Sequence, residues 1–198
     1  IIKNKINSNL YLEKPIAPNP TKSIKLIKYL KKQKIIFKVA YLFFYCEWFK
    51  ILNSKKNISI NWSFKSKSFV SKNWKSNEKK GGGIINFYGI HLIALISKLG
   101  NFVCQSSHVS KNVWRAKYKY NEKIIKVKIN INKKEIFIIK SVNEILYKAS
   151  SPFYKKKLKN KIDPRVIYLT KYLKEKKQNI NHDLINKLWY ETLKKTKV

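Results

Sequence analysis

Residues 81–100 have the sequence GGGIINFYGIHLIALISKLG, which holds all five glycines of the chain. Three of the glycines are consecutive, and an almost wholly apolar segment follows them. Such a segment predicts a buried helix that stops at Gly100, the position after a helix C-terminus where glycine is favoured. One histidine, His91, interrupts the apolar residues. The stretch therefore predicts a buried helix that carries a single histidine.

His91 has two interpretations, a packed core residue or the centre of a site. On a helix, Phe87 and Tyr88 lie one turn before it, and Ala94 and Leu95 lie one turn after it. None of these neighbours is a carboxylate, whereas a catalytic imidazole usually needs a partner that fixes its tautomer. These residues by themselves favour a core histidine and leave the functional alternative open.

The glycine run also has two interpretations. Glycine has no Cβ atom, so the backbone can approach a ligand or another chain segment closely, next to a helix N-terminus with free N–H groups. The alternative is a flexible loop tip. The run is no dinucleotide-binding turn, because the chain contains no G-x-G-x-x-G spacing.

Alternating apolar and polar side chains predict strands on both sides of this helix. Residues 58–64 alternate in this way, and a polar loop at residues 65–80 precedes the glycines. Four further runs follow the helix, at residues 102–109, 113–120, 124–131 and 135–140, and their short connections predict an antiparallel meander. The predicted fold class is α+β, with a large, mainly antiparallel open sheet of five or six strands and helices on one face.

The beginning of the chain predicts a strand, a loop and a helix. An extended run at residues 9–12 ends in Glu13-Lys14-Pro15, and Thr21 is the predicted N-cap of a helix that runs to residue 34. The β-branched and aromatic residues 35–45 predict a buried strand, followed by a short helix at residues 47–52.

The end of the chain is predicted to be helical. Asp163 followed by a proline predicts the start of a helix over residues 165–176, and Asn181 is the predicted cap of a second helix. The basic segment at residues 155–161 is interpreted as a solvated linker.

The formal net charge is +35, because 45 Lys and Arg face only 10 Asp and Glu. Such a charge ordinarily suggests a nucleic-acid partner. However, only Arg115 and Arg165 are arginines, and the lysines are spread along the whole chain. Arginine makes most bidentate contacts to phosphate and guanine. We therefore interpret the charge mainly as solvated lysine and predict no specific nucleic-acid partner.

The two cysteines, Cys46 and Cys104, form no C-x-x-C pair and predict buried free thiols instead of a metal site. The longest apolar runs are shorter than the roughly 20 residues that span a bilayer, and the first residues lack signal-peptide features. We therefore expect a cytoplasmic protein without a membrane partner. The chain begins Ile-Ile-Lys and contains no methionine, from which we expect a fragment of a longer protein.

Two motifs together resemble the Gfo/Idh/MocA family of nicotinamide-dependent sugar and polyol oxidoreductases. They are Glu13-Lys14-Pro15 at the end of a strand, and Gly81-Gly82-Gly83-x5-Gly89-x-His91. The resemblance covers most of the chain. It implies that residues 1–34 are the last part of a Rossmann-like nucleotide-binding domain, and that residues 35–198 form the sheet domain with its terminal helices. The open face of that sheet is expected to mediate homo-oligomerisation.

The resemblance also implies roles for individual residues. Lys14 is expected to bind and polarise the reacting oxygen, and His91 to exchange its proton. Glu13, Lys14 and Pro15 are expected to border NAD or NADP, and Gly83 to border a sugar-like substrate. The phenol of Tyr88 is a further candidate for hydrogen bonding to the imidazole or to a sugar hydroxyl. No metal is expected.

This sequence departs from the family pattern in two places. Phe87 and Ala94 stand where aspartates are common, and Phe87 can neither accept a hydrogen bond through its side chain nor supply charge. The phosphate-binding turn of the family is also absent, so we expect no tight binding of NAD(P) by these 198 residues. Three functions remain: an oxidoreductase, a catalytically impaired assembly or sugar-binding protein with the same fold, and a basic polyanion-binding protein.

Overall fold

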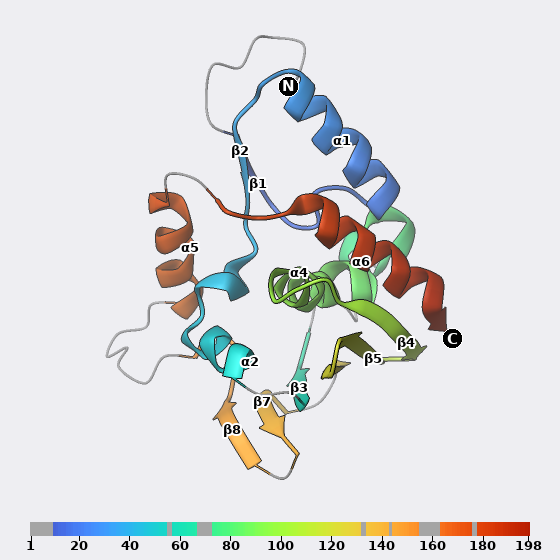
Figure 1. Cartoon of the computed structure of the whole chain (residues 1–198), viewed down its shortest axis with the longest axis vertical. Helices are drawn as coiled ribbons and strands as arrows, with labels where there is room; N and C mark the ends of the chain where they lie inside the picture. Colours follow the sequence, from blue (N-terminus) through green and yellow to red (C-terminus); the bar gives the residue numbers. More distant parts are fainter. Residues whose placement is uncertain are drawn as a thin grey trace.

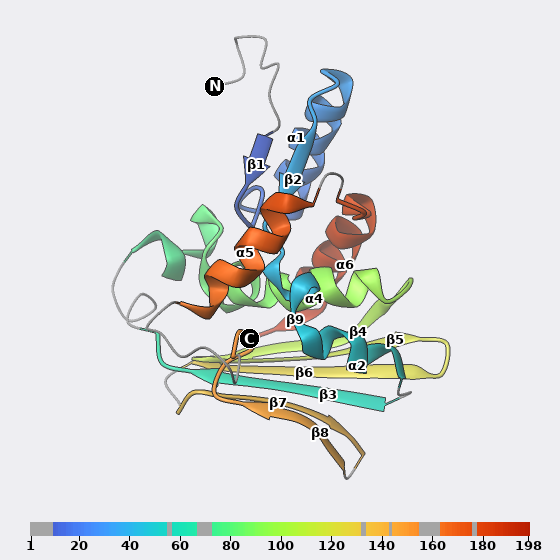
Figure 2. The same cartoon turned by 90° about the vertical axis from the view of Figure 1, so that its left-hand side faces the viewer.

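The computed structural model describes residues 10–54, 57–66, 73–131, 134–142, 144–154, 163–175 and 178–198. Residues 67–72 of the loop predicted at residues 65–80, and the linker predicted at residues 155–161, lie outside them. A seven-stranded sheet forms the base of the molecule, with the strand order β8-β7-β3-β6-β5-β4-β9 (Figures 1 and 2). Its strands are β3 (Asn57–Phe64), β4 (Val103–Ser110), β5 (Val113–Tyr120), β6 (Lys123–Ile131), β7 (Ile136–Ser141), β8 (Glu144–Ala149) and β9 (Thr196–Lys197).

The helices lie on one side of this sheet, and the other side is open (Figure 2). The helices are α1 (Pro20–Lys32), α2 (Ile51–Ser54), α4 (Ile90–Lys98), α5 (Pro164–Lys174) and α6 (His182–Lys195). Neighbouring strands are antiparallel, except that β3 is parallel to β6 and β9 is parallel to β4. The predicted α+β fold with a mainly antiparallel open sheet is confirmed. No helix among the described residues has the length and apolar character needed to cross a membrane.

The sheet differs from the predicted meander in the position of β3. The connections predict that β7 pairs with β6, but β3 lies between them and contacts both. Strand β3 is apolar on the side that faces the helices, where Ile58, Ile60 and Trp62 are buried, so a central position suits it. Strand β8 was not predicted, because exposed residues dominate this edge strand and leave little alternation in its sequence.

A second, two-stranded parallel sheet pairs β1 (Leu10–Leu12) with β2 (Phe37–Val39). Strand β2 is much shorter than the predicted strand over residues 35–45, and a 3-10 turn, η1 (Leu42–Tyr45), follows it. On the edge of β2 that faces away from β1, the side-chain amide of Gln178 both donates to and accepts from the Val39 backbone at 2.8 Å. The apolar and aromatic residues 41–45 that follow pack in the core and do not continue the strand.

The helix caps agree with the sequence in two cases and differ in one. Asp163 and Asn181 accept hydrogen bonds from the first backbone N–H groups of α5 and α6, as predicted. Helix α1 is capped by Asn19 instead of Thr21, with Pro20 in its first turn. The amide oxygen of Asn19 accepts from the Lys22 backbone at 2.9 Å, and proline at the first helical position needs no partner for an N–H group.

Helix α4 lies between the sheet and α6, and its residues 90–97 are all buried. This location explains why the segment is apolar on all sides. A π-helical turn, η5 (Ile84–Gly89), precedes it. In this turn the side-chain oxygen of Asn86 accepts a hydrogen bond from the indole N–H of Trp189 at 3.0 Å. This bond links η5 to α6.

The glycines allow close approach between chain segments. A Cβ atom on Gly82 would lie 2.2 Å from the Trp74 carbonyl oxygen, and one on Gly89 would lie 2.7 Å from the Trp114 ring. Gly83 has a φ of +85°, a region that favours glycine. The glycine run is therefore no exposed loop tip, because its three residues are buried against the preceding turns. Gly89 lets the helix lie directly on strand β5.

Candidate active site

A cleft of about 440 Å³ brings together the two motifs that the sequence singles out. It lies where the loop after β1 meets η5, α4 and α5. Its lining consists of Glu13, Lys14, Ala40, Leu42, Trp62, Phe87, Tyr88, His91, Phe153, Asp163, Arg165, Val166 and Leu169. Ionisable side chains therefore converge on a cleft whose remaining walls are mostly apolar, which is the usual character of a small-molecule site.

Lys14 is held by the residue that replaces the expected aspartate. Its Nζ atom donates a hydrogen bond to the backbone carbonyl of Phe87 and lies 4.0 Å from the centre of the Phe87 ring. Burial lowers the pKa of Lys14 to about 7, with Glu13 opposing this shift and Lys75 adding to it. The ammonium and amine forms are thus comparably populated at neutral pH, which suits a group that binds or exchanges a proton.

His91 is 7% exposed and packs its ring on Phe43, with ring centres 4.7 Å apart. Its Nδ1 atom is buried without a hydrogen-bond partner among the described residues. Burial, together with the charge of Lys14, lowers the pKa of His91 well below its usual 6.5. The imidazole is therefore uncharged at neutral pH and can accept a proton. A buried polar atom without a partner costs stability, and in His91 this atom belongs to a residue that lines the cleft.

Tyr88 lines the same cleft, and its hydroxyl lies 2.7 Å from the hydroxyl of Ser66. Burial raises the pKa of its phenol, so the group is protonated at neutral pH. The ring packs against Phe64 and Phe87, with ring centres 4.7 and 4.8 Å away. Tyr88 thus lines the same cleft as His91, and its hydroxyl group pairs with Ser66.

The other predicted residues lie in different places. Glu13 lines the cleft with an exposed side chain, whereas Pro15 and Gly83 are not among its lining residues. The Lys14–Pro15 peptide bond is cis. Gly83 instead borders the Glu78 side chain, which a Cβ atom on Gly83 would approach to 2.7 Å. Its part in substrate binding stays a prediction.

Two charged residues of the cleft were not predicted as site residues. The guanidinium of Arg165 donates to both carboxylate oxygens of Asp163, with Nε 2.8 and 3.0 Å from them. Hydrogen bonding to Arg165 lowers the pKa of Asp163. The sequence signal for Asp163 was a helix cap, and nothing in it indicated that the start of α5 would face Lys14. Only the three-dimensional fold joins segments about 150 positions apart.

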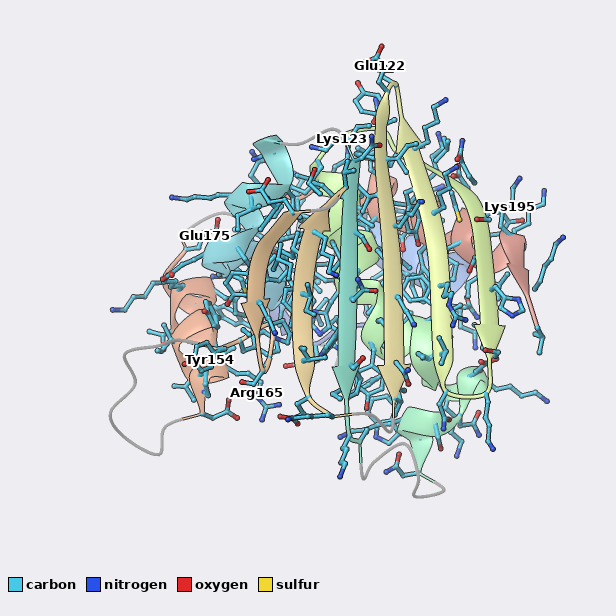
Figure 3. All side chains as sticks on the ribbon, turned by 90° about the horizontal axis from the view of Figure 1, so that it is seen from below. Glu122, Lys123, Tyr154, Arg165, Glu175 and Lys195 are labelled. Atoms are coloured by element: carbon cyan, nitrogen blue, oxygen red, sulfur yellow. The ribbon has the colours of Figure 1, made fainter. Side chains whose placement is uncertain are left out.

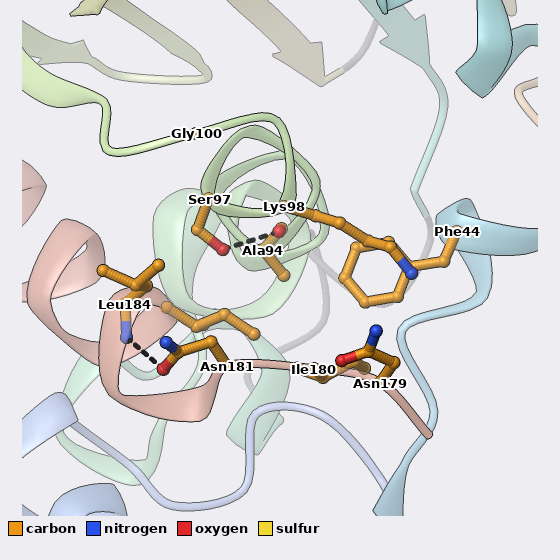
Figure 4. Close-up of a pocket in the computed structure, with 10 residues that line it drawn as sticks. Phe44, Ala94, Ser97, Lys98, Gly100, Asn179, Ile180, Asn181 and Leu184 are labelled. Atoms are coloured by element: carbon orange, nitrogen blue, oxygen red, sulfur yellow. Dashed lines mark hydrogen bonds between the residues drawn. The ribbon is translucent and has the colours of Figure 1, made fainter. Parts of the chain in front are cut away.

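A second cavity, of about 300 Å³, lies between the end of α4 and the start of α6 (Figure 4). Among the described residues of its lining, only Lys98 is ionisable, and its Nζ atom lies 4.8 Å from the centre of the Phe44 ring. Asn179 and Asn181 contribute amides, and the Asn181 oxygen is occupied by helix capping. Acid–base chemistry is therefore better supported in the first cleft.

The described residues contain no group of three or more His, Cys, Asp or Glu arranged to hold a metal ion. Cys46 and Cys104 are both buried free thiols, as predicted. The cleft thus offers Lys14, a neutral His91, the Arg165–Asp163 pair, the carboxylate of Glu13 and the phenol of Tyr88 as its ionisable groups.

The fold resembles solved dehydrogenase structures along nearly its whole length. The WlbA (WbpB) dehydrogenase from Thermus thermophilus, solved with NAD and UDP-GlcNAcA, aligns over 96% of this chain with a TM-score of 0.71 and 15% identity. Scyllo-inositol dehydrogenase from Lactobacillus casei, solved with NAD(H) and scyllo-inositol, aligns over 94% with a TM-score of 0.62 and 11% identity. This chain has the fold of Gfo/Idh/MocA-type dehydrogenases.

The chain spans 65% of that WlbA structure and 69% of the inositol dehydrogenase. A dehydrogenase (MviM) from Clostridium difficile aligns similarly, with a TM-score of 0.61, 14% identity, and coverage of 94% of this chain and 70% of the other. No protein-family model and no curated protein matches the sequence. At these identities the similarity shows the fold, and the activity has to be argued from the cleft.

Proposed function

We propose that the parent protein is an oxidoreductase that transfers hydride between NAD(P) and a hydroxyl or carbonyl carbon of a sugar, sugar nucleotide or polyol. The observation that carries this proposal is the convergence of Lys14 and His91, from segments 77 positions apart, on one cleft. The dehydrogenases of the same fold provide support, because they were solved with NAD or NADH and sugar-type ligands.

The residues of the cleft fit a nicotinamide cofactor at its reactive end. The imidazole of His91 and the Nζ atom of Lys14 offer a proton acceptor and a donor beside an apolar wall. The cofactor would supply hydride acceptance and donation. Glu13, Lys14 and Pro15 would border its nicotinamide end. Its phosphates need a glycine-rich turn that this sequence does not contain, so we place that turn in a preceding segment of the parent protein.

The protein's own groups would handle the oxygen and its proton. In the oxidation direction, the Lys14 ammonium donates a hydrogen bond to the substrate hydroxyl and stabilises its developing negative charge. The uncharged imidazole of His91 accepts the hydroxyl proton as the carbonyl forms and the hydride leaves the same carbon. The reverse direction returns this proton to the oxygen. Tyr88 would position a neighbouring hydroxyl group of the substrate.

Turnover of the parent protein with NAD⁺ or NADP⁺ tests this proposal. The substrates would be a panel of neutral polyols, sugars and UDP-sugars, with cofactor reduction followed by absorbance. Lys14→Met and His91→Ala are expected to lower kcat/KM at least about 100-fold, whereas Lys25→Met, a change on exposed α1, should leave it unchanged. Substrate turnover that survives both cleft substitutions would refute the assignment. A Tyr88→Phe variant with unchanged turnover would remove Tyr88 from it.

The second candidate is a catalytically impaired protein that binds sugars or assembles through its sheet. Phe87 favours it, because a carbonyl and an aromatic ring contact Lys14 where the family resemblance implies a carboxylate. Binding of a sugar nucleotide without any cofactor reduction by the parent protein would support this candidate over the first. Homo-oligomerisation through the open sheet face and a cytoplasmic location both stay predictions.

A further inference from the structure

Trp74 is the exposed member of the five tryptophans of the chain, with 47% of its surface in contact with solvent. It begins a 3-10 turn, η3 (Trp74–Ser76), which lies a few residues before the glycine run. A single exposed apolar residue is common in proteins, so its surroundings decide what this ring does. The other four tryptophans are buried: Trp48, Trp62, Trp114 and Trp189.

The ring of Trp74 extends the wall of the cleft to the surface. It meets the ring of Phe87 edge to face, with ring centres 5.3 Å apart and planes at 85°. Phe87 lines the cleft, and its ring centre lies 4.0 Å from the Nζ atom of Lys14. A ligand whose reacting group meets Lys14 therefore has a second aromatic surface one ring away, at the rim of the cleft.

The glycine run holds the turn that carries Trp74. A Cβ atom on Gly82 would lie 2.2 Å from the Trp74 carbonyl oxygen and 2.5 Å from that of Lys75, so a side chain at position 82 would clash with this turn. The Gly82 N–H donates to the Asn77 carbonyl at 2.8 Å, and the Asn77 N–H donates to the Trp74 carbonyl at 3.0 Å. The side-chain oxygen of Asn73 accepts from the Lys75 N–H at 2.9 Å. The backbone at Trp74 is thus fixed before a ligand binds, which reduces the entropy lost on binding.

Positive charge lies next to this ring. Lys75 follows Trp74 directly, and its Nζ atom lies 5.5 Å from the centre of the Phe87 ring. Burial is the main reason that the pKa of Lys14 is lowered, and the charge of Lys75 adds to the effect, so this charge acts in the cleft. Within the described part of the chain, Lys75 forms no ion pair. Its ammonium is therefore available to an anionic group of a ligand.

A second cation lies at the same end of the molecule. Figure 3 shows Arg165, which lines the cleft, at the end of the main sheet at which β3 stops, and Glu122 at the opposite end. The η3 turn lies at the Arg165 end in both Figure 2 and Figure 3. The exposed ring and the cations are thus gathered at the end of the sheet that carries the cleft.

A planar ring with phosphate beside it is the nucleotide part of a sugar nucleotide. An indole face stacks on any nucleobase, because every base has a π face. An ammonium group binds phosphate through its charge and its N–H donors. A polyol or a single neutral sugar has neither a planar ring nor a charge and would leave both Trp74 and Lys75 unused.

We propose that Trp74 stacks on the nucleobase of a nucleoside diphosphate sugar and that Lys75 contacts its diphosphate, while the sugar enters the cleft beside Lys14. This inference rests on the function proposed for the cleft and narrows its substrate class to sugar nucleotides. It also gives the glycine run a role, which is to hold the turn that binds the nucleotide.

Acrylamide quenching of tryptophan fluorescence in the 198-residue chain tests this proposal, because Trp74 is the tryptophan that the quencher reaches. The probe is UDP, which should lower the quenching of the wild type towards that of Trp74→Leu, where only buried tryptophans remain. This measurement in the wild type needs no variant to fold. Quenching that UDP leaves unchanged would overturn the proposal.

Calorimetric titration with UDP measures the contribution of each residue. Trp74→Leu should lower the affinity about tenfold or more, and Lys75→Met about threefold or more. The matched controls are Tyr190→Leu, which changes an exposed aromatic residue of α6, and Lys25→Met on α1. Both controls should keep the affinity within about twofold of the wild type. Equal losses in Lys75→Met and Lys25→Met would show that the charge acts diffusely and contradict the role of Lys75.

Two further probes separate the base from the charge and from the sugar. Pyrophosphate carries charge without a ring, and N-acetylglucosamine carries a sugar ring without a base. Neither should protect Trp74 from acrylamide as UDP does. Equal protection by pyrophosphate would show that charge alone is bound, and equal protection by N-acetylglucosamine would assign the ring to the sugar; either result would overturn the proposal.

Turnover of the parent protein separates this inference from the function on which it rests. With UDP-glucose and NAD⁺ or NADP⁺, Trp74→Leu should raise KM about tenfold or more and lower kcat much less, whereas His91→Ala should lower kcat. Binding of UDP at Trp74 without hydride transfer from any substrate would refute the proposed function and leave the nucleotide subsite standing. An unchanged KM for UDP-glucose in a folded Trp74→Leu variant would refute the subsite alone.

Discussion

The Nζ atom of Lys14 contacts Phe87 twice, through a hydrogen bond to its backbone carbonyl and at 4.0 Å from the centre of its ring. A carbonyl and a ring face attract a cation but hold it less strongly than a carboxylate does. Burial therefore dominates, and the pKa of Lys14 falls to about 7. The residue that interrupts the family pattern thus supplies no charge that would offset the burial of Lys14.

Replacing Phe87 by aspartate should reverse this effect. A carboxylate beside Lys14 favours the ammonium form, so the pKa of Lys14 is expected to rise above 7 by one unit or more, on the order of 1–3. The shift can be measured by NMR titration of the lysine side chain. Phe87→Leu is the matched control, because it removes the ring without adding charge. A Lys14 pKa that stays near 7 in Phe87→Asp would contradict this explanation.

Lys14 should also make stability depend on pH. Its folded pKa is about 7 and its usual value is 10.5, so the unfolded chain binds more protons between these values. The free energy of unfolding of the wild type, relative to Lys14→Met, should therefore rise from pH 7 towards pH 10, by at most about 1.4 kcal/mol per pH unit. Below pH 7 the difference should be constant. Urea unfolding of both proteins from pH 6 to 10 measures this difference in unfolding free energy. A difference that falls as the pH rises would contradict the prediction.

His91 and His182 offer a matched pair of substitutions. Each has a buried Nδ1 atom without a partner among the described residues, but only His91 lines the cleft. Burial lowers the pKa of His182 to about 4, so this imidazole is also uncharged at neutral pH. Leucine at either position removes an unsatisfied polar atom and should change stability by no more than about 1–2 kcal/mol.

Turnover of the parent protein should separate these two histidines. His91→Leu is expected to lower kcat at least about 100-fold, and His182→Leu to leave it within about twofold. If both variants retain full turnover, the interpretation of His91 as a packed core residue is correct.

The hydrogen bond between Asn86 and Trp189 should matter for stability and not for the cleft chemistry. Asn86→Leu leaves the indole N–H of Trp189 buried without an acceptor, at an expected cost of about 1–3 kcal/mol. Trp189→Phe removes the donor. A double-mutant cycle in urea should give a coupling energy of about 0.5–3 kcal/mol. Strict additivity of the two changes would mean that the bond does not join η5 to α6.

Arg165 should distinguish anionic from neutral substrates. Its guanidinium lines the cleft and pairs with Asp163, so a substrate carboxylate or phosphate can take over part of that pairing. Arg165→Met is expected to raise KM for an anionic sugar or a sugar nucleotide about tenfold or more, and to leave KM for a neutral polyol unchanged. Equal effects on both substrate classes would assign Arg165 to folding of the α5 terminus instead.

The sequence predicted those parts of the fold that depend on local patterns. The apolar segment around His91, the alternation in β3 and the caps at Asp163 and Asn181 each act over a few residues, and the structure confirms them. The insertion of β3 between β6 and β7 depends on contacts between distant segments, and short connections favoured the wrong neighbour. The strand predicted over residues 35–45 is present only at Phe37–Val39, because packing of the residues after it against the core selects apolar side chains just as a strand does.

The candidate site was predictable only where a motif named its residues. Lys14 and His91 were singled out by the resemblance, and the structure brings them to one cleft. Arg165 and Asp163 were not, because a helix N-cap followed by a first-turn arginine is a common pattern that does not indicate a site. The hydrogen bond from Lys14 to the backbone carbonyl of Phe87 could not be predicted either, because sequence patterns describe side chains.

Hydride transfer from a deuterated substrate tests the central claim most directly. The parent protein would be incubated with NAD⁺ or NADP⁺ and a sugar or polyol deuterated at the reacting carbon, and the reduced nicotinamide examined by mass spectrometry. We predict that deuterium appears in the nicotinamide with the wild type and is lost with His91→Leu and with Lys14→Met. Absence of transfer from every substrate of the panel, or transfer that persists in both variants, would contradict the account.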